Sequence, residues 1–408
     1  MKWRVLFLIW LLQFVNYLDR INLSIAAPTM MRDLHITPGW FGLVLAAFTL
    51  GYAIIQIPGG WLADRFGARA LLIASPLAWS VFTGLTGMVG SVASLISVRV
   101  LFGLGEGASN GPSFKLVGDW FTSEERSKAN GLYLTALALG PAFVAPVAVW
   151  LLARAGWQGM FLWFTLPGVA MAGLIWLLVP ARPPAVPMAP AERDAPGIGW
   201  RDVVARRSSW MLFFAYMAFN IAFWGYLGWM PSYLALSRHI ELSHLGFDAS
   251  LPYLAGFVGM LVFGWLGSGP LYRHRAILVA AGYLLAACAL YATFTADTIA
   301  GCVTGLSVAA FFLYGGFGPV WAIVLDLTPA GARGAFSGFV NCGGQIGGFF
   351  APIVVGYLVS ATASFTGGFL FMMAGLFVSA VCFAALHPVL RHRERGHDFG
   401  PAGDIPAR

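Results

Sequence analysis

The chain has 408 residues, of which 59% are hydrophobic and only 10% are charged. Because soluble domains carry about 25% charged residues, this composition excludes an ordinary soluble globular protein. The formal net charge of +7 does not indicate nucleic acid as a partner, since the basic residues are separated by long apolar segments.

Apolar windows of about 20 residues recur along nearly the whole chain, and each is long enough to cross a hydrocarbon core of about 30 Å as a helix. They predict an all-α integral membrane protein with twelve transmembrane helices. The expected spans are residues 5–27, 41–63, 70–89, 93–114, 127–152, 158–179, 209–236, 250–270, 276–295, 298–324, 337–360 and 365–386.

Basic residues identify the cytoplasmic side of these spans. With both termini inside, 19 of the 24 Lys and Arg residues lie on the cytoplasmic side, and only Arg32, Arg154 and Arg238 lie outside. Arg20 and Arg99 fall within spans. By the positive-inside rule, this bias predicts a multi-pass protein of the lipid bilayer with cytoplasmic termini. The short N-terminus and first loop indicate a bacterial inner membrane.

The two halves of the chain repeat each other. Residues 119–131 and 326–338 both read Asp-x6-Arg-x4-Gly, at an offset of 207 residues. Such a repeat predicts two pseudo-symmetric six-helix bundles in the same orientation. The expected organisation is an N-terminal bundle over 1–180, a Pro-rich cytoplasmic linker over 181–208, a C-terminal bundle over 209–388 and a basic cytoplasmic tail over 389–408.

Two acid–base pairs interrupt the apolar spans: Asp19 and Arg20 in the first, Arg99 and Glu106 in the fourth. A charge at the bilayer centre costs about 2.5–3.5 kcal/mol, so these groups face a cavity or one another. They either lock the bundle as structural ion pairs or mark a transport pathway. Arginine stays protonated and binds carboxylates with two parallel hydrogen bonds, so Arg20 is the candidate anion contact. A permanent pair with Asp19 is the alternative role for Arg20.

A proton-coupled pathway also needs a carboxyl group that changes its protonation state. Burial favours the neutral carboxyl and a nearby arginine favours the carboxylate, so Asp19 and Glu106 are both candidate proton carriers. Spans seven to twelve contain no charged residue and would supply neutral contacts. The candidates there are Tyr216, Asn220, Trp224, Trp321, Asn341 and Gln345.

The cysteines and glycines indicate no disulfide, metal site or nucleotide site. The four cysteines lie within spans without a CxxC pattern or a nearby histidine, so neither a disulfide nor a metal site is expected. The glycine runs at 103–107 and 343–348 follow no strand, which excludes a nucleotide loop and favours close helix packing. No cofactor is expected.

Residues 60–69 read Gly-x3-Asp-Arg-x-Gly-x-Arg and resemble the signature loop of the major facilitator superfamily (MFS). A second set of motifs resembles the anion:cation symporter family, which includes galactonate, glucarate and hexuronate transporters and the sialins. That set comprises residues 16–24, 56–60, Arg99 with Glu106, 120–126 and 229–234. The resemblance implies the MFS fold, with two bundles rocking about a central site. It also implies a monomer that imports a small organic anion, such as a sugar acid, together with protons.

The resemblance also implies roles for particular residues. Substrate contacts match Arg20, Tyr52 and Asn341, and the polar residues of the fourth span match Arg99 and Glu106. Relatives often carry a glutamine on the fifth helix, where this chain offers only Thr135; this leaves room for a smaller or more aromatic carboxylate. The expected gating residues are Asp64, Arg65, Arg69, Arg126 and Arg333.

Three other classes of membrane protein stay open. An organophosphate or carboxylate antiporter would need a further basic residue in the second half, and none lies within those spans. A proton-driven exporter of lipophilic cations fits the buried acids but not the buried arginines. A membrane enzyme would need a catalytic cluster, and the seven histidines lie only in loops and the tail.

Overall fold

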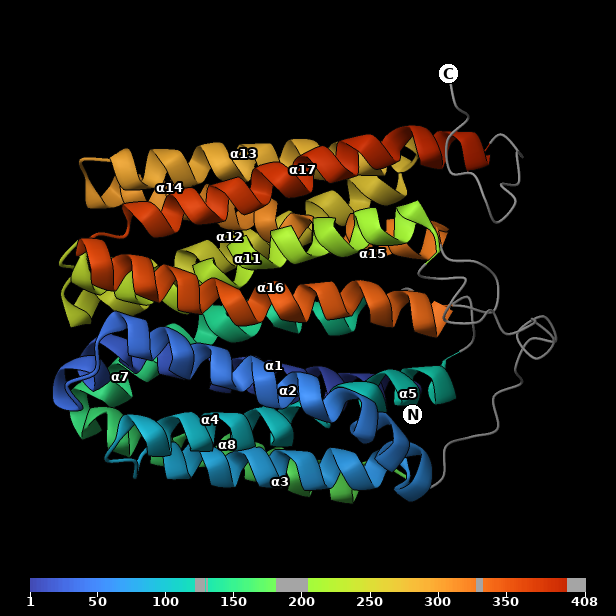
Figure 1. Cartoon of the computed structure of the whole chain (residues 1–408). Coiled ribbons are helices and arrows are strands. Elements are labelled where there is room, and N and C mark those ends of the chain that lie inside the picture. Colours follow the sequence, from blue (N-terminus) through green and yellow to red (C-terminus); the bar gives the residue numbers. More distant parts are fainter. Residues whose placement is uncertain (122–128, 130, 181–204, 328–332, 395–408) are drawn as a thin grey trace. The chain divides into compact units, whose positions relative to one another are not determined.

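The computed structural model describes the chain apart from residues 122–128, 130, 181–204, 328–332 and 395–408. The described residues form helices and connecting turns without a strand (Figure 1). Most of the expected linker, Arg126 and the end of the expected tail therefore lie outside the description. The last helix continues to Glu394, into the range expected for the tail.

The chain divides into two compact units. The first comprises Met1–Ala189, Leu227–Ser250 and Pro352–Phe365, and the second comprises the remaining residues. The first unit thus contains the expected N-terminal bundle together with segments of three helices from the second half. The division into bundles at 1–180 and 209–388 stays a proposal.

The longer helices build most of the described part of the N-terminal half. They are α1 (Lys2–Asp33), α2 (Pro38–Phe66), α3 (Ala68–Thr86), α4 (Val92–Gly107), α5 (Asn110–Trp120), α7 (Ala136–Trp163) and α8 (Thr165–Leu178). Gly156 has φ 64° and ψ 179° inside α7, a left-handed conformation that suits glycine. The chain therefore breaks at Gly156, between two helical pieces of α7.

The C-terminal half is built in the same way. Its elements are α11 (Arg207–Leu236), α12 (Leu242–Ser268), the 3-10 turn η1 (Tyr272–His274), α13 (Arg275–Thr295), α14 (Ile299–Gly315), α15 (Phe317–Leu327), α16 (Arg333–Thr362) and α17 (Thr366–Glu394). A short turn at Ala108 and Ser109 separates α4 from α5, and one at Gly316 separates α14 from α15; these residues keep right-handed helical backbone angles, so both spans continue through the turn. Turns at equivalent places in both halves support the internal repeat seen in the sequence.

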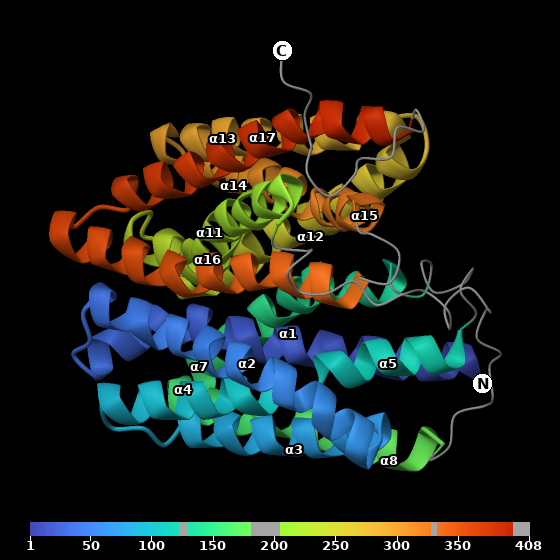
Figure 2. The same cartoon turned by 45° about the vertical axis from the view of Figure 1, so that its right-hand side comes forward.

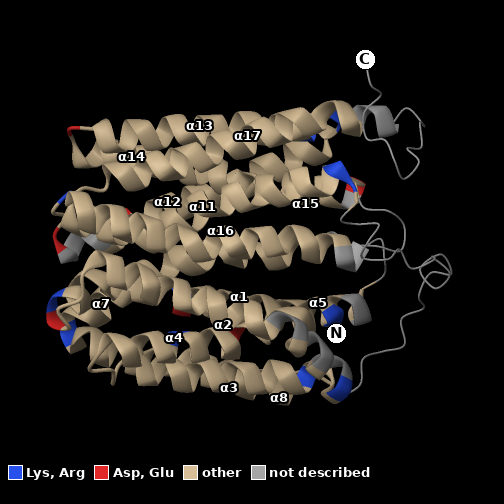
Figure 3. Cartoon of the chain, viewed as in Figure 1, with Lys and Arg blue, Asp and Glu red and all other residues tan. Residues whose placement is uncertain are grey.

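Ten described segments are long and apolar enough to cross a membrane. One of them, residues 131–178, includes the break at Gly156, and α1 is not among the ten. The expected number of twelve spans is consistent with these findings. Figure 3 shows tan helix centres with charges gathered at the helix ends, apart from small patches beside the labels of α2 and α4.

Glycines bring α2 and α4 into backbone contact. A Cβ added to Gly103 would lie 2.8 Å from the Tyr52 nitrogen, and one added to Gly51 would meet the Val100 carbonyl. Figures 1 and 2 show the two helices side by side. Small residues at a helix crossing allow this close approach. It places the side chains of α2 against the charged residues of α4.

We expect Gly103→Ala to destabilise the protein by about 1–3 kcal/mol, because an added methyl group would overpack the crossing. Thermal unfolding of the purified protein in detergent measures the effect. Gly173→Ala is the matched control, since a Cβ there would have no neighbour within 4 Å. Equal melting temperatures for the two variants would contradict the close contact of α2 with α4.

Candidate substrate and proton site

One face of α1 is polar although it is buried. Gln13, Asn16, Tyr17 and Arg20 are spaced by three or four residues, and each is at most 8% exposed. Residues at this spacing lie on the same side of a helix. Inside the first unit, this face of α1 therefore carries two amides, a phenol and a guanidinium group.

Arg20 forms a buried ion pair with Glu106. The Arg20 Nε donates to Glu106 Oε1, and their side chains are 6% and 0% exposed. The pair joins α1 to α4, so Arg20 reaches a carboxylate on another helix. Removing one partner of such a pair would leave the other charge buried and uncompensated.

Three aromatic rings surround the Arg20 guanidinium. Its central carbon lies 4.5 Å from the ring centre of Tyr17, 5.0 Å from that of Phe48 and 4.9 Å from that of Tyr52. Guanidinium groups within about 6 Å of a ring face are stabilised by the ring quadrupole. The rings therefore hold the cation in place beside Glu106 without adding a second negative charge.

Asp19 and Arg99 form the second charged part of the site. The Arg99 guanidinium carbon lies 4.3 Å from the Phe102 ring centre and 5.5 Å from that of Phe48, so Phe48 contacts both arginines. Asp19 Oδ1 accepts a hydrogen bond from Asn22 Nδ2 at 3.3 Å. Asp19 Oδ2 and Arg99 Nε are buried, with no hydrogen-bond partner in the part of the chain that is described.

The expected fifth span contains Tyr133, in the helical turn that precedes α7. The Tyr133 hydroxyl lies 2.7 Å from Gln13 Oε1 and 3.2 Å from Asn110 Oδ1. This span thus offers a second polar residue beside Thr135, the one expected from the sequence. Thr135 accepts a hydrogen bond from Trp10 Nε1 at 2.9 Å.

Neutral side chains cluster in the second unit. The rings of Tyr216 and Trp321 meet edge to face with centres 5.5 Å apart, and Asn220 Nδ2 donates to the Tyr216 carbonyl at 2.8 Å. Gly344 of α16 packs directly against Tyr216 and Asn220. Three expected contacts of α11 and α15 are thereby brought together. Asn341 and Gln345 lie on α16 on either side of Gly344 and are half-buried.

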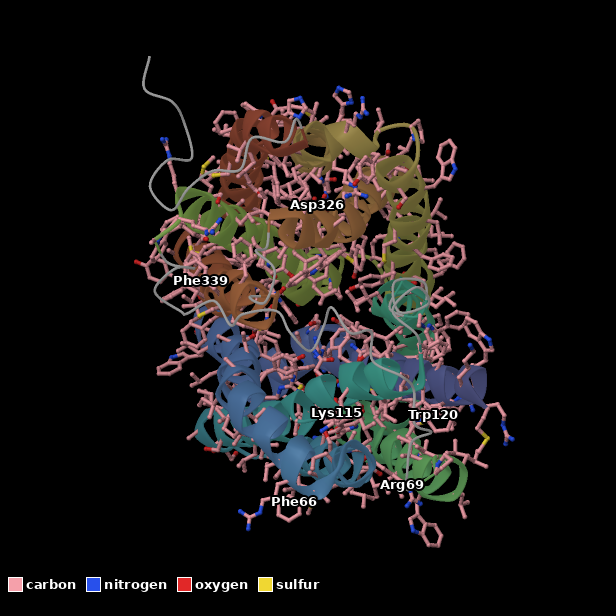
Figure 4. The ribbon with its side chains drawn as sticks, turned by 90° about the vertical axis from the view of Figure 1, so that its right-hand side faces the viewer. Phe66, Arg69, Lys115, Trp120, Asp326 and Phe339 are labelled. Atoms are coloured by element: carbon pink, nitrogen blue, oxygen red, sulfur yellow. The ribbon has the colours of Figure 1, made fainter. Side chains whose placement is uncertain are left out.

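The expected gating residues are only partly described. Arg69 Nη2 donates to the Trp176 carbonyl, and Arg65 is exposed, with its guanidinium 5.6 Å from the Phe66 ring centre. Figure 4 labels Arg69 and Phe66 in the first unit, where α2 ends and α3 begins. The side chains of Asp64 and Arg333 lie outside the description.

The second unit contains an ion pair of its own, between Arg275 and Asp326, which the sequence did not lead us to expect. Arg275 Nη1 pairs with Asp326 Oδ2 at 2.7 Å, and Arg275 Nε donates to the Gly267 carbonyl at 2.6 Å. The contact joins α12, α13 and α15 where those helices end or begin. Asp326 is the first residue of the second copy of the Asp-x6-Arg-x4-Gly repeat. That repeat is the sequence signal that could have identified Asp326 as a candidate.

Other polar residues of the first unit were also missed. The spacing of Gln13, Asn16 and Tyr17 before Arg20 indicates that these residues share one face of a helix. Asn110 and Tyr133 carry no such signal, because their contacts come from three different helices. Among the described residues, no group of three or more His, Cys, Asp or Glu side chains could hold a metal ion.

Long apolar helices around a buried ion pair are the architecture of a multi-pass membrane protein. The sequence profile of the Major Facilitator Superfamily matches residues 9–352, and the chain belongs to this family. The expected family and fold class are thereby confirmed, and the family consists of transporters rather than enzymes.

Curated relatives cover nearly the whole chain. A probable sulfoacetate transporter of Cupriavidus necator is 32% identical, covering 93% of this chain and 92% of the relative. A probable galactarate/D-glucarate transporter of Bacillus subtilis is 31% identical, with coverages of 99% and 96%. A bacterial homologue of the human lysosomal transporter Spinster, solved inward-facing and unoccupied, has a TM-score of 0.80 at 18% identity, with coverages of 98% and 99%. These comparisons confirm a transporter with sugar-acid and organic-anion transporters among its relatives.

Proposed function

We propose that this transporter carries a small organic anion into the bacterial cell together with protons, across the inner membrane and with both termini in the cytoplasm. The observation that carries the proposal is the ion pair of Arg20 with Glu106, buried among three aromatic rings. The relatives named for sulfoacetate, galactarate and glucarate transport support an acidic substrate. The protein would act as a monomer and without a cofactor.

Through this ion pair, proton binding would be coupled to anion binding. While Glu106 is ionised, it occupies the guanidinium of Arg20. Protonation of Glu106 removes the charge that holds the pair, and Arg20 then binds the acidic group of the substrate with parallel hydrogen bonds. Proton and anion thus bind together, and the buried site avoids an uncompensated charge. Asp19 would be a second proton carrier because its carboxyl is buried, at 1% exposure, next to Arg20 on α1.

The remaining expected residues take supporting roles in this proposal. Tyr52 and Arg99 would contact the anion from the first unit. The neutral residues of the second unit would contact the uncharged part of the substrate, namely Tyr216, Asn220, Trp321, Asn341 and Gln345. Asp64, Arg65, Arg69, Arg126 and Arg333 would act at the inner gate.

Uptake into proteoliposomes with an acidic exterior tests the proposal. The panel contains labelled sulfoacetate, galactonate, glucarate, a hexuronate and an aromatic carboxylate. We expect accumulation of at least one anion above its equilibrium concentration, and a loss of this accumulation when the pH gradient is collapsed. Anion exchange that ignores the pH gradient would instead establish an antiporter. Efflux of ethidium with no anion uptake would establish an exporter.

A further inference from the structure

Arg99 is buried without an anionic partner among the described residues. It is 3% exposed, and its guanidinium group forms no ion pair with any residue that the structure describes. Its Nε has no hydrogen-bond partner there either. The guanidinium group contacts the rings of Phe48 and Phe102, which carry no charge. Because a buried charge without a partner is costly, Arg99 favours the binding of an anion beside it.

Arg99 lies close to Arg20, the expected contact of the acidic group of the substrate. The Phe48 ring centre is 5.0 Å from the Arg20 guanidinium carbon and 5.5 Å from that of Arg99. The two guanidinium carbons are therefore no farther apart than the sum of these distances. Glu106, the ion-pair partner of Arg20, follows Arg99 by two turns on α4, which is about 10 Å along one face of the helix. A short carbon chain with an acidic group at each end spans such a gap and accepts two parallel hydrogen bonds from each arginine.

The total charge of the site also favours an anion with two acidic groups. Asp19 and Glu106 balance Arg20 and Arg99, so the four side chains sum to zero when all of them are ionised. Protonation of both carboxyl groups leaves two positive charges, which a dianion neutralises and a monoanion does not. The expected spans of the second half contain no charged residue that could supply the difference. A dianion bound together with two protons therefore leaves the buried site without a net charge, which avoids the cost of an uncompensated one.

We propose that the substrate is a small dianion, held by Arg20 at one acidic group and by Arg99 at the other, and carried together with two protons. The ring of Phe48 contacts both guanidinium groups and holds them at a fixed spacing. Aldarates and sulfonated carboxylates belong to this class of anion, whereas aldonates and hexuronates have a single acidic group. The inference rests on the proposed function, because it names the class of anion that the same site takes.

Matched pairs of anions test this substrate class. Galactarate and galactonate differ at one end, where galactarate has a carboxylate and galactonate a hydroxymethyl group, and sulfoacetate and isethionate differ in the same way. Their dissociation constants for the purified wild type are measured by isothermal titration calorimetry. We expect the dianion of at least one pair to bind about 10-fold more tightly than its monoanion, since the second acidic group gains hydrogen bonds to a charged group. Equal binding within both pairs would overturn the inference.

Arg99→Gln shows whether Arg99 contacts the second acidic group. It should weaken binding of the preferred dianion about 10-fold more than binding of the matched monoanion, so that the two affinities become similar. If Arg99 only supported the fold, both affinities would fall by the same factor, and this result would overturn its role. Arg99→Lys keeps the charge and serves where the glutamine variant does not fold; it should reduce the preference for the dianion by a smaller factor.

Arg154→Gln is the matched control for these variants. Arg154 is also an arginine beside an aromatic ring, with its guanidinium carbon 4.5 Å from the Trp150 ring centre, but it is exposed. We expect this variant to keep the wild-type preference for the dianion. A loss of preference as large as that in Arg99→Gln would overturn the role of Arg99.

Transport measurements separate this inference from the proposed function. A dianion that moves with two protons carries no net charge, so a potassium diffusion potential imposed with valinomycin should leave its uptake rate unchanged. An uptake rate that follows the potential would overturn the charge balance, and the inference with it. A wild type that accumulates only monoanions under a pH gradient would overturn the inference and leave the proposed function standing. A wild type that accumulates no anion of either kind would overturn both.

Discussion

Replacing Arg20 by lysine is expected to lower anion uptake at subsaturating concentration by about 10- to 100-fold, which corresponds to about 1.4–2.8 kcal/mol. An ammonium group keeps the charge but loses the planar fork that binds a carboxylate with two hydrogen bonds. It also loses the stacking against Tyr17, Phe48 and Tyr52 that places the cation. Initial uptake rates in proteoliposomes measure the effect across a range of substrate concentrations.

Arg32→Lys is the matched control for this substitution. The Arg32 side chain is 76% exposed and pairs with its neighbour Asp33 in a surface ion pair of little energetic value. Uptake by this variant should equal that of the wild type. If Arg20→Lys also retained the wild-type KM, the Arg20–Glu106 pair would be a structural lock rather than part of the anion site.

The charged residues of this site could be found from the sequence, whereas their pairing could not. Charges within apolar spans identify Asp19, Arg20, Arg99 and Glu106, because each needs a polar environment in the membrane. Which carboxylate pairs with Arg20 depends on the rotation of α1 against α4. That rotation is set by packing, for example by the close contact of Gly140 in α7 with Tyr17 of α1, rather than by composition.

The same limit applies to the turns within the helices. The sequence predicts the long spans, since hydropathy requires only local composition. It does not predict the short turns that separate α4 from α5 and α14 from α15 within the fourth and tenth spans. The first of these turns precedes Asn110, which begins α5 and donates from Nδ2 to the Tyr52 hydroxyl. Tertiary contacts of this kind connect residues more than 50 positions apart and have no sequence period.

Replacing Glu106 by glutamine is expected to abolish accumulation driven by the pH gradient while preserving exchange of labelled for unlabelled anion. Glutamine resembles the protonated carboxyl in shape but takes up no proton, and it no longer holds Arg20 by charge. Arg20 should therefore stay available to the anion, and the dissociation constant should be unchanged or lower. Gradient-driven uptake and counterflow, measured on the same proteoliposomes, distinguish loss of coupling from loss of transport.

Asp33→Asn controls for the loss of a carboxylate, since Asp33 is 38% exposed at the end of α1 and should leave accumulation intact. Asp19→Asn in the same assay shows how much of the coupling Asp19 carries. Accumulation by Glu106→Gln at the wild-type level would exclude Glu106 as the proton carrier and leave that role to Asp19. The Arg20 and Glu106 variants act on opposite ends of one ion pair, yet the first should weaken anion binding and the second only its dependence on protons. This contrast is expected if the pair couples proton binding to anion binding. If the pair were purely structural, substitution of either residue would impair the same property.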